Sequence, residues 1–268
     1  MTDVAMKTLI VEDDTATRRG LEESIKDFGG EPHAVGTAKQ AEAALKQFQP
    51  HLLIVDISLP DGDGLALLRA AREERPDLDA VVITGSSSID HAIESFCAGA
   101  SNPYIRANTW QAVRLLFSSL RRTRENPHDL DARLSSQQAV WLATQGLFRV
   151  PMGASHGISY LLGSIGGAPH GYTSCVTLPA VLRWNESVNG ELQRELAEAI
   201  GEPGTSVADS LGELLDELSL PRTLKDIGIV AEMIPQIVKY ALQSPIVATN
   251  PRPIKTEADV LEILKLAS

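Results

Sequence analysis

Residues 84–106, TGSSSIDHAIESFCAGASNPYIR, decide the fold because two different sequence patterns meet in them. Before this stretch, short apolar runs alternate with segments of helical periodicity, and after it apolar residues recur at helical spacing only. The stretch can therefore end a parallel sheet or open a helical domain. Because both patterns need the same residues, at least one of the two domains is expected to be incomplete. Pro103 disfavours a central strand, so we predict a helix over 89–97 and no strand at 103–106.

Four apolar runs in the N-terminal part are typical of buried strands. They lie at residues 7–11, 31–35, 51–56 and 80–84, with helical segments at 15–28 and 38–47 and from residue 65 onward. Strands that alternate with helices form right-handed crossover units and a parallel sheet. We predict an α/β fold, a flavodoxin-like parallel sheet of four strands in the order 2-1-3-4, followed by an all-α domain.

Polar side chains stand at the C-terminal ends of these predicted strands. Glu12 and Asp13 follow the first strand, Asp56 ends the third, and the fourth ends at Thr84. Ligands of parallel sheets bind beyond these strand ends, so the three carboxylates are expected to converge. A hard cation relieves their repulsion, and Mg²⁺ prefers oxygen ligands. A carboxylate that Mg²⁺ orients can attack a phosphoryl donor and form an aspartyl phosphate, with Thr84 placed to donate a hydrogen bond to the phosphoryl group.

Three motifs in this part closely resemble the receiver domain of two-component response regulators. They are LIVEDD at 9–14, LLIVDISLPDGDG at 52–64 and VVITG at 81–85. The resemblance implies that Asp56 is the phosphoacceptor, that Glu12 and Asp13 hold Mg²⁺, and that Thr84 is the switch hydroxyl. It also implies a sensor histidine kinase or a small phosphodonor as partner. Arg106 stands where the family has a lysine, and its planar guanidinium differs from a compact ammonium charge.

The C-terminal part contains three histidines in glycine-rich or helical surroundings. His91 lies in DHAIE, His156 in MGASHGISYLLG and His170 in GGAPHGYTS. Neutral imidazoles suit Zn²⁺ or Fe²⁺, and three protein ligands leave one coordination position open for a substrate. Asp90 is adjacent, but we expect it to project to another side of the helix.

Longer motifs in residues 88–268 closely resemble the helical domain of iron-type alcohol dehydrogenases, in the branch of maleylacetate reductase. They include DHAIESFCAGASNP at 90–103 and MGASHGISYLLGSIGGAPHGYTSCVTLPAVLRWN at 152–185. The resemblance implies that His91, His156 and His170 are metal ligands. The family's fourth ligand, an aspartate, corresponds to Ser87 here, and Tyr160 stands where many members have a further histidine. The family also binds NAD(P) on a glycine-rich loop, which residues 1–84 lack, so NAD(P) binding is not expected.

Composition places limits on location and partners. The 268 residues carry a net charge of −11 without a basic stripe, which argues against a nucleic-acid partner. No apolar run is long enough to span a membrane. The two cysteines form neither a disulfide framework nor a CxxC pair, so a reducing cytoplasm is expected. An exposed apolar sheet edge would favour contact with the helical domain or a homo-oligomer.

Three interpretations follow from these patterns. The first is a chimera for signalling, with a truncated receiver-like phosphoacceptor domain at 1–88 and a metal-binding helical domain at 89–268. The alternative is an enzyme, a metal-dependent NAD(P)-linked alcohol dehydrogenase or maleylacetate reductase relative. The third is a junction of two pieces that fold without function. We favour the first, because the phosphoacceptor motifs are nearly complete whereas the dehydrogenase motifs lack a nucleotide site and one metal ligand.

Overall fold

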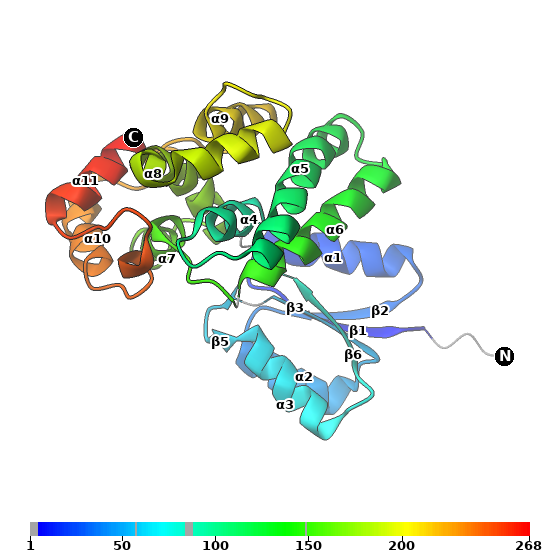
Figure 1. Ribbon diagram of the computed structural model, residues 1–268. Coiled ribbons are helices and arrows are strands. Elements are labelled where there is room, and N and C mark those ends of the chain that lie inside the picture. Colours follow the sequence, from blue (N-terminus) through cyan, green and yellow to red (C-terminus); the bar gives the residue numbers. More distant parts are fainter. Residues whose placement is uncertain (1–4, 57, 84–87, 148) are drawn as a thin grey trace. The chain divides into compact units, whose positions relative to one another are not determined.

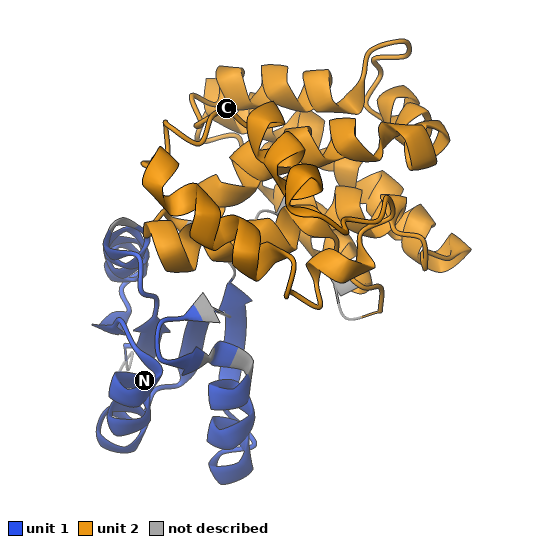
Figure 2. Ribbon diagram, turned by 90° about the vertical axis from the view of Figure 1, so that its left-hand side faces the viewer, with its two compact units in different colours: residues 1–85 blue, residues 86–268 orange. Residues whose placement is uncertain are grey.

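The computed structural model describes residues 5–56, 58–83, 88–147 and 149–268. The chain divides into two compact units, Met1–Gly85 and Ser86–Ser268, drawn in two colours in Figure 2. The division falls three residues before the boundary expected from the sequence. No helix in the described ranges is long and apolar enough to cross a membrane.

The first unit is a parallel sheet with helices on both faces. Its elements are β1 (Lys7–Val11), α1 (Thr15–Asp27), β2 (Glu31–Val35), α2 (Ala38–Phe48), β3 (Leu52–Asp56), the short hairpin β4 (Ser58–Leu59) and β5 (Gly62–Asp63), α3 (Gly64–Glu74) and β6 (Asp79–Ile83). The main sheet has the order β2-β1-β3-β6, with every pair parallel, which confirms the predicted order 2-1-3-4. Helices α2 and α3 cover one face and α1 covers the other (Figure 1).

The core of this unit follows from the alternation of side chains along its strands. Leu9 and Val11 of β1 and Leu53 and Val55 of β3 are fully buried and pack with apolar residues of α2 and α3. The edge strand β6 is less buried than β1 and β3. Val81 and Val82, which point to opposite faces of the sheet, are 47% and 38% exposed. The apolar sheet edge expected from a four-stranded sheet is therefore present.

The second unit consists of helices. They are α4 (Ser88–Cys97), α5 (Pro103–Glu125), α6 (Leu130–Leu147), α7 (Ala154–Gly166), α8 (His170–Ala199), α9 (Val207–Glu217), α10 (Ile234–Ala241) and α11 (Glu257–Leu266), with 3₁₀ turns at Ala231–Met233 and Val247–Thr249. Pro103 begins α5, and the Asn102 side chain caps it by accepting from the Ile105 amide. The predicted absence of a strand at 103–106 is thus confirmed, because proline suits the first turn of a helix.

Two large apolar clusters account for most of the core of the helical unit. One joins α7, α8, α10 and α11 and contains Ile158, Trp184 and Ile263. The other joins α4, α5, α8 and α9 and contains Phe96, Phe117 and Leu211. Helix α8 contributes residues to both clusters, whereas α7 belongs to the first and α4 to the second.

Candidate functional sites

The first candidate site is a group of three carboxylates at the C-terminal edge of the sheet. Glu12 directly follows β1 and Asp56 ends β3, and these two strands are neighbours in the sheet. Oxygen atoms of Glu12, Asp13 and Asp56 all lie within 4.8 Å of one another. Glu12 and Asp56 are 5% and 4% exposed, whereas Asp13 faces solvent. The group therefore combines two buried carboxylates with one that solvent reaches, an oxygen set that suits a partly hydrated Mg²⁺ ion.

Backbone contacts fix the position of these carboxylates. The Arg18 guanidinium donates to the carbonyl oxygens of Glu12 and Asp13, at 2.6 and 2.9 Å. The Glu12 carboxylate accepts from the Asp14 amide at 3.0 Å, and Asp14 in turn caps α1. Gly64 begins α3 directly against β3, where a Cβ atom would overlap the Asp56 carbonyl oxygen. The turn that carries the site is therefore tied to the sheet and to α1 and α3.

The electrostatics of the group favour a bound cation or a bound proton. The pKa of the Glu12 carboxyl is raised to about 7, mainly by burial and also by the charges of Asp56 and Asp13, although the hydrogen bond from the Asp14 amide lowers it. A proton and Mg²⁺ would both relieve the repulsion, because each brings positive charge to the same oxygens. The donor set consists of oxygen only, which fits Mg²⁺.

The two other residues assigned to phosphoryl chemistry lie elsewhere in the chain. Thr84 falls outside the described residues. Arg106 lies in the first turn of α5, in the helical unit, where its charge lowers the pKa of the Cys97 thiol although burial raises that pKa to about 12. Arg106, which corresponds to the lysine of receiver domains, thus lies on a helix and not at the end of a strand.

The second candidate site is a buried cluster in the helical unit. Asp90 and Glu94 stand one turn apart on α4, so their side chains share a face. Oxygen atoms of both lie within 4.8 Å of each other and of a His156 ring nitrogen from α7. All three residues are buried. Asp90 was expected to project to another side of the helix than the adjacent His91. It lies on the face of α4 that it shares with Glu94, and its carboxylate comes close to His156 of α7.

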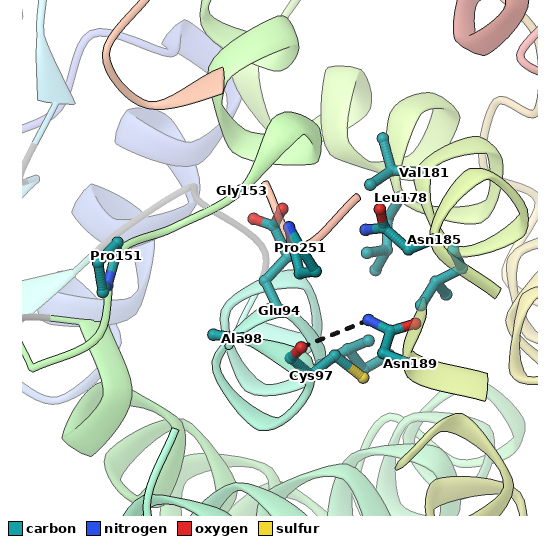
Figure 3. A pocket seen from close by; sticks show the side chains of 12 residues that line it. Glu94, Cys97, Ala98, Pro151, Gly153, Leu178, Val181, Asn185, Asn189 and Pro251 are labelled. Atoms are coloured by element: carbon teal, nitrogen blue, oxygen red, sulfur yellow. Dashed lines mark hydrogen bonds between the residues drawn. The ribbon is translucent and has the colours of Figure 1, made fainter. Parts of the chain in front are cut away.

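Glu94 receives the N-terminus of α7. Its two carboxylate oxygens accept from the backbone amides of Ser155, at 3.1 Å, and His156, at 3.3 Å. The N-cap residue Gly153 has no side chain to cap the helix, so Glu94 supplies the missing acceptor from α4. Figure 3 shows the Glu94 carboxylate directed toward Gly153. This contact positions His156 relative to α4.

Asp90 belongs to a network of buried hydroxyl groups. Its carboxylate accepts from Ser155 Oγ at 2.9 Å, and Ser155 Oγ lies 3.1 Å from Thr177 Oγ1 on α8. Burial raises the pKa of Asp90 to about 6, although hydrogen bonds from Ser174 and Ser155 lower it. Burial and the Asp90 charge also raise the pKa of Glu94 well above its usual range. Two carboxyl groups this close resist ionising together unless a cation joins them.

The three predicted histidines are only partly described. The His91 and His156 rings lie 5.1 Å apart between centroids, and both residues are buried. Tyr160 meets the His156 ring edge to face at 4.8 Å, one turn along α7. His170 begins α8, but its side chain is outside the described part, as is Ser87. Asp90 and Glu94 were missed as candidate ligands, although their four-residue spacing with His91 between them was a usable signal.

A small cavity borders this cluster on the side of α8. It has a volume of about 20 Å³ and is lined by Glu94, Cys97, Gly153, Asn185 and Asn189, among others. Figure 3 shows Asn189 donating to the Cys97 carbonyl oxygen across it, at 3.3 Å. This volume suits about one water molecule, and the amide and carboxylate groups give such a molecule polar partners.

The fold and these two sites define a class of protein in which a receiver-type sheet precedes a helical domain with a buried carboxylate–histidine cluster. Residues 8–105 match the response regulator receiver domain, and residues 81–268 match the Fe-containing alcohol dehydrogenase family, C-terminal. The chain therefore belongs to the Fe-containing alcohol dehydrogenase family and also carries a receiver domain.

Individual relatives agree with this assignment. The chain is 30% identical to 1,3-propanediol dehydrogenase of Citrobacter freundii, over 69% of this chain and 50% of that protein. It is 34% identical to maleylacetate reductase 2 of Cupriavidus pinatubonensis, over 69% and 51%. The chain thus spans about half the length of these curated relatives. An alcohol dehydrogenase structure from Oenococcus oeni has a similar fold, with a TM-score of 0.74 and 19% identity over 98% of this chain and 92% of that one.

Proposed function

We propose that the protein is a phosphoacceptor module, with Asp56 as acceptor, joined to a metal-binding helical domain of dehydrogenase type. One observation carries the proposal, the convergence of Glu12, Asp13 and Asp56 at the sheet edge. In a signalling role the receiver-like domain is truncated, since residues 103–106 begin a helix. We also propose a sensor histidine kinase or a small phosphodonor as its source of phosphate, and self-association as a homo-oligomer.

The chemistry of the proposed step is a phosphoryl transfer to oxygen. A carboxylate oxygen of Asp56 attacks the phosphorus of acetyl phosphate, and a new P–O bond forms while the P–O bond to acetate breaks. Acetate leaves with the electron pair, so no proton has to be removed from Asp56. Mg²⁺, when bound, would supply positive charge to the phosphoryl oxygens. Glu12 and Asp13 would hold that ion, and Arg18 keeps their backbone in place.

Intact-mass spectrometry after incubation with acetyl phosphate tests this proposal. We expect wild type to gain one phosphoryl group in the presence of Mg²⁺ and none after chelation. Asp56→Asn should gain none, whereas Asp27→Asn, a change at the exposed end of α1, should behave as wild type. Equal labelling of Asp56→Asn and wild type, or no labelling of either, would contradict the proposal.

A second function is favoured by the buried cluster of Asp90, Glu94 and His156. We propose that this cluster, with His91 and His170 as further candidates, binds Fe²⁺ or Zn²⁺. Two carboxylates and an imidazole fit either ion, and the raised pKa values of Asp90 and Glu94 show how poorly the site tolerates its own negative charge. The alternative function is then a metal-dependent alcohol dehydrogenase or maleylacetate reductase activity, as named for the relatives.

Calorimetry with Zn²⁺, and with Fe²⁺ under anaerobic conditions, distinguishes two sets of ligands. If Asp90 and His156 bind the ion, Asp90→Asn weakens binding about tenfold or more, because a buried charged ligand is lost. His170→Ala then has little effect. If the histidines alone bind it, His170→Ala weakens binding and Ser87→Asp, which restores a carboxylate, tightens it. Absence of metal binding in wild type and Ser87→Asp would refute both sets.

We do not expect this chain to turn over NAD(P) by itself. Residues 1–84 lack a glycine-rich phosphate loop, and the sheet edge where nucleotides bind in such folds carries Glu12, Asp13 and Asp56 instead. The turn at 85–88 is the other place for a pyrophosphate, and its residues 85–87 lie outside the described part of the chain. What remains in the helical unit can hold a metal and orient a small substrate, which supports binding without hydride transfer.

A further inference from the structure

The helical unit contains an apolar cavity that neither proposed function uses. It has a volume of about 270 Å³ and lies among α4, α5, α6, α8 and α9. Its inner wall is made by buried aliphatic side chains, including Leu116, Leu178 and Leu211. Its outer wall includes the partly exposed Leu120, Val140 and Leu218. The cavity therefore has a buried interior and a boundary that solvent reaches, as a ligand needs for entry.

We propose that this cavity is a binding site for an uncharged aliphatic or alkyl-aromatic molecule. The proposal is independent of the phosphoacceptor and of the metal cluster. It rests on the size of the cavity and on the chemistry of the side chains that surround it, all of which lie within the helical unit.

The lining selects against charged and strongly polar ligands. Among the described residues that line the cavity, none has a charged side chain. The Ser136 hydroxyl is already bonded to Ser119 Oγ, at 2.8 Å, and to the Ala132 carbonyl oxygen, at 3.2 Å. The Ser174 hydroxyl lies near Asp90, whose pKa it lowers. A charged ligand would lose its hydration without compensation, and water itself would find few partners.

The volume indicates the size of the ligand. Close-packed protein interiors rarely keep voids much larger than a water molecule, so a cavity of 270 Å³ is unusual unless something fills it. An apolar cavity of about 150 Å³ accommodates benzene, so simple scaling gives roughly ten carbon atoms here. A ligand of that size would bury most of its surface against a lining made mainly of leucine, isoleucine and valine side chains, and this burial is the main source of affinity for an apolar ligand.

Two probes with the same carbon skeleton test the chemistry of the site. n-Butylbenzene has the expected size and no charge, and 4-phenylbutanoate has a carboxylate in place of its terminal methyl group. Calorimetry on the full chain should show a single site for n-butylbenzene and at least about tenfold weaker binding of 4-phenylbutanoate, because the carboxylate must be desolvated. Equal affinity for the two probes, or no binding of n-butylbenzene, would overturn the proposal.

Paired variants test the location. Val140→Phe fills the cavity from α6 and should weaken n-butylbenzene binding about tenfold or more. The same change at Val188, which is 54% exposed on α8 and does not line the cavity, should leave binding within about twofold of wild type. Leu120→Trp fills the cavity from α5 and replaces Val140→Phe in this test if that variant does not fold. Unchanged binding in a folded filling variant would place the probe elsewhere and overturn the proposal.

Discussion

Glu12 shows how a single residue can couple ion binding to pH. Its pKa is raised from 4.5 to about 7, so the folded chain holds this proton more tightly than the unfolded chain does. Stability contributed by the protonated form is therefore lost as pH rises from about 4.5 to about 7. A cation at the same oxygens replaces the proton, so bound Mg²⁺ would restore that stability at the upper end of this range.

We predict that Mg²⁺ binds more tightly as pH rises through about 7, with release of a proton at lower pH. Calorimetry in buffers of different ionisation enthalpy measures both quantities. Glu12→Gln should weaken binding and remove the pH dependence around 7, whereas Glu42→Gln, an exposed change on α2, should preserve both. A Glu12→Gln protein with the pH profile of wild type would show that another group titrates.

The sequence predicted the receiver carboxylates better than the carboxylates of the helical unit. Glu12 and Asp56 follow strands, and parallel strands bring their ends to one edge whatever the details of packing. Asp90 and Glu94 stand on a helix, where their direction depends on how α4 packs against α7 and α8. Acidic residues on helices usually face solvent, so only the tertiary structure shows that these two are buried.

At the scale of elements, α3 approaches β3 closely because Gly64 has no side chain. A Cβ atom at this position would overlap the Asp56 carbonyl oxygen, which is backbone and cannot rotate away. Gly64→Ala should therefore displace α3 or the end of β3, and reduce both phosphoryl acceptance by Asp56 and the stability of the first unit.

A second glycine provides the control for this prediction. Gly20 lies in the exposed part of α1 with no atom within 4 Å of an added Cβ, so Gly20→Ala should raise helix stability by up to about 1 kcal/mol. Thermal unfolding followed by circular dichroism, with the acetyl phosphate assay, compares the two variants. If Gly64→Ala unfolded and labelled as Gly20→Ala does, the close approach would have no functional importance.

Most elements could be predicted because their signals are local. Pro103 argued against a strand and begins α5 in the structure, and Thr256 with Asp259 forms the capping box that opens α11. Helix α8 was harder, because it contains Pro179 and a break in helical geometry at Asn189. Gln193 spans this break by donating to the Leu182 carbonyl oxygen and to Asn189 Oδ1, both at 2.9 Å. The periodicity of apolar residues does not reveal hydrogen bonds of this kind, so it could not predict that α8 continues past the break.

At the scale of the whole chain, each unit keeps the chemistry of a different class. The first unit has a carboxylate edge suited to a cation and an incoming phosphoryl group. The second unit has a buried cluster suited to a transition metal, and an apolar cavity besides. In parallel sheets a dinucleotide lies across the C-terminal edge and places its pyrophosphate at a helix N-terminus. In this chain, Glu12, Asp13 and Asp56 lie at that edge.

We therefore predict that neither NADH nor NADPH binds measurably to this chain. The pyrophosphate of each carries negative charge, and Glu12, Asp13 and Asp56 would repel it at the edge where it should lie. The glycines that allow a backbone to approach pyrophosphate are missing from residues 9–14, which read LIVEDD. Without a held nicotinamide, the positioning that hydride transfer requires is lost, even with a metal in the helical unit.

Fluorescence titration with NADH and NADPH, followed by assays with maleylacetate and simple alcohols in added Fe²⁺ or Zn²⁺, tests this prediction. We expect no saturable change and no turnover above the level of the metal alone. Glu12→Gln with Asp13→Asn removes two of the charges, and it should not create binding, because the glycine-rich loop is still absent. Saturable binding with metal-dependent turnover that disappears in His156→Ala would instead make the dehydrogenase the principal function, with the carboxylate edge subordinate to it.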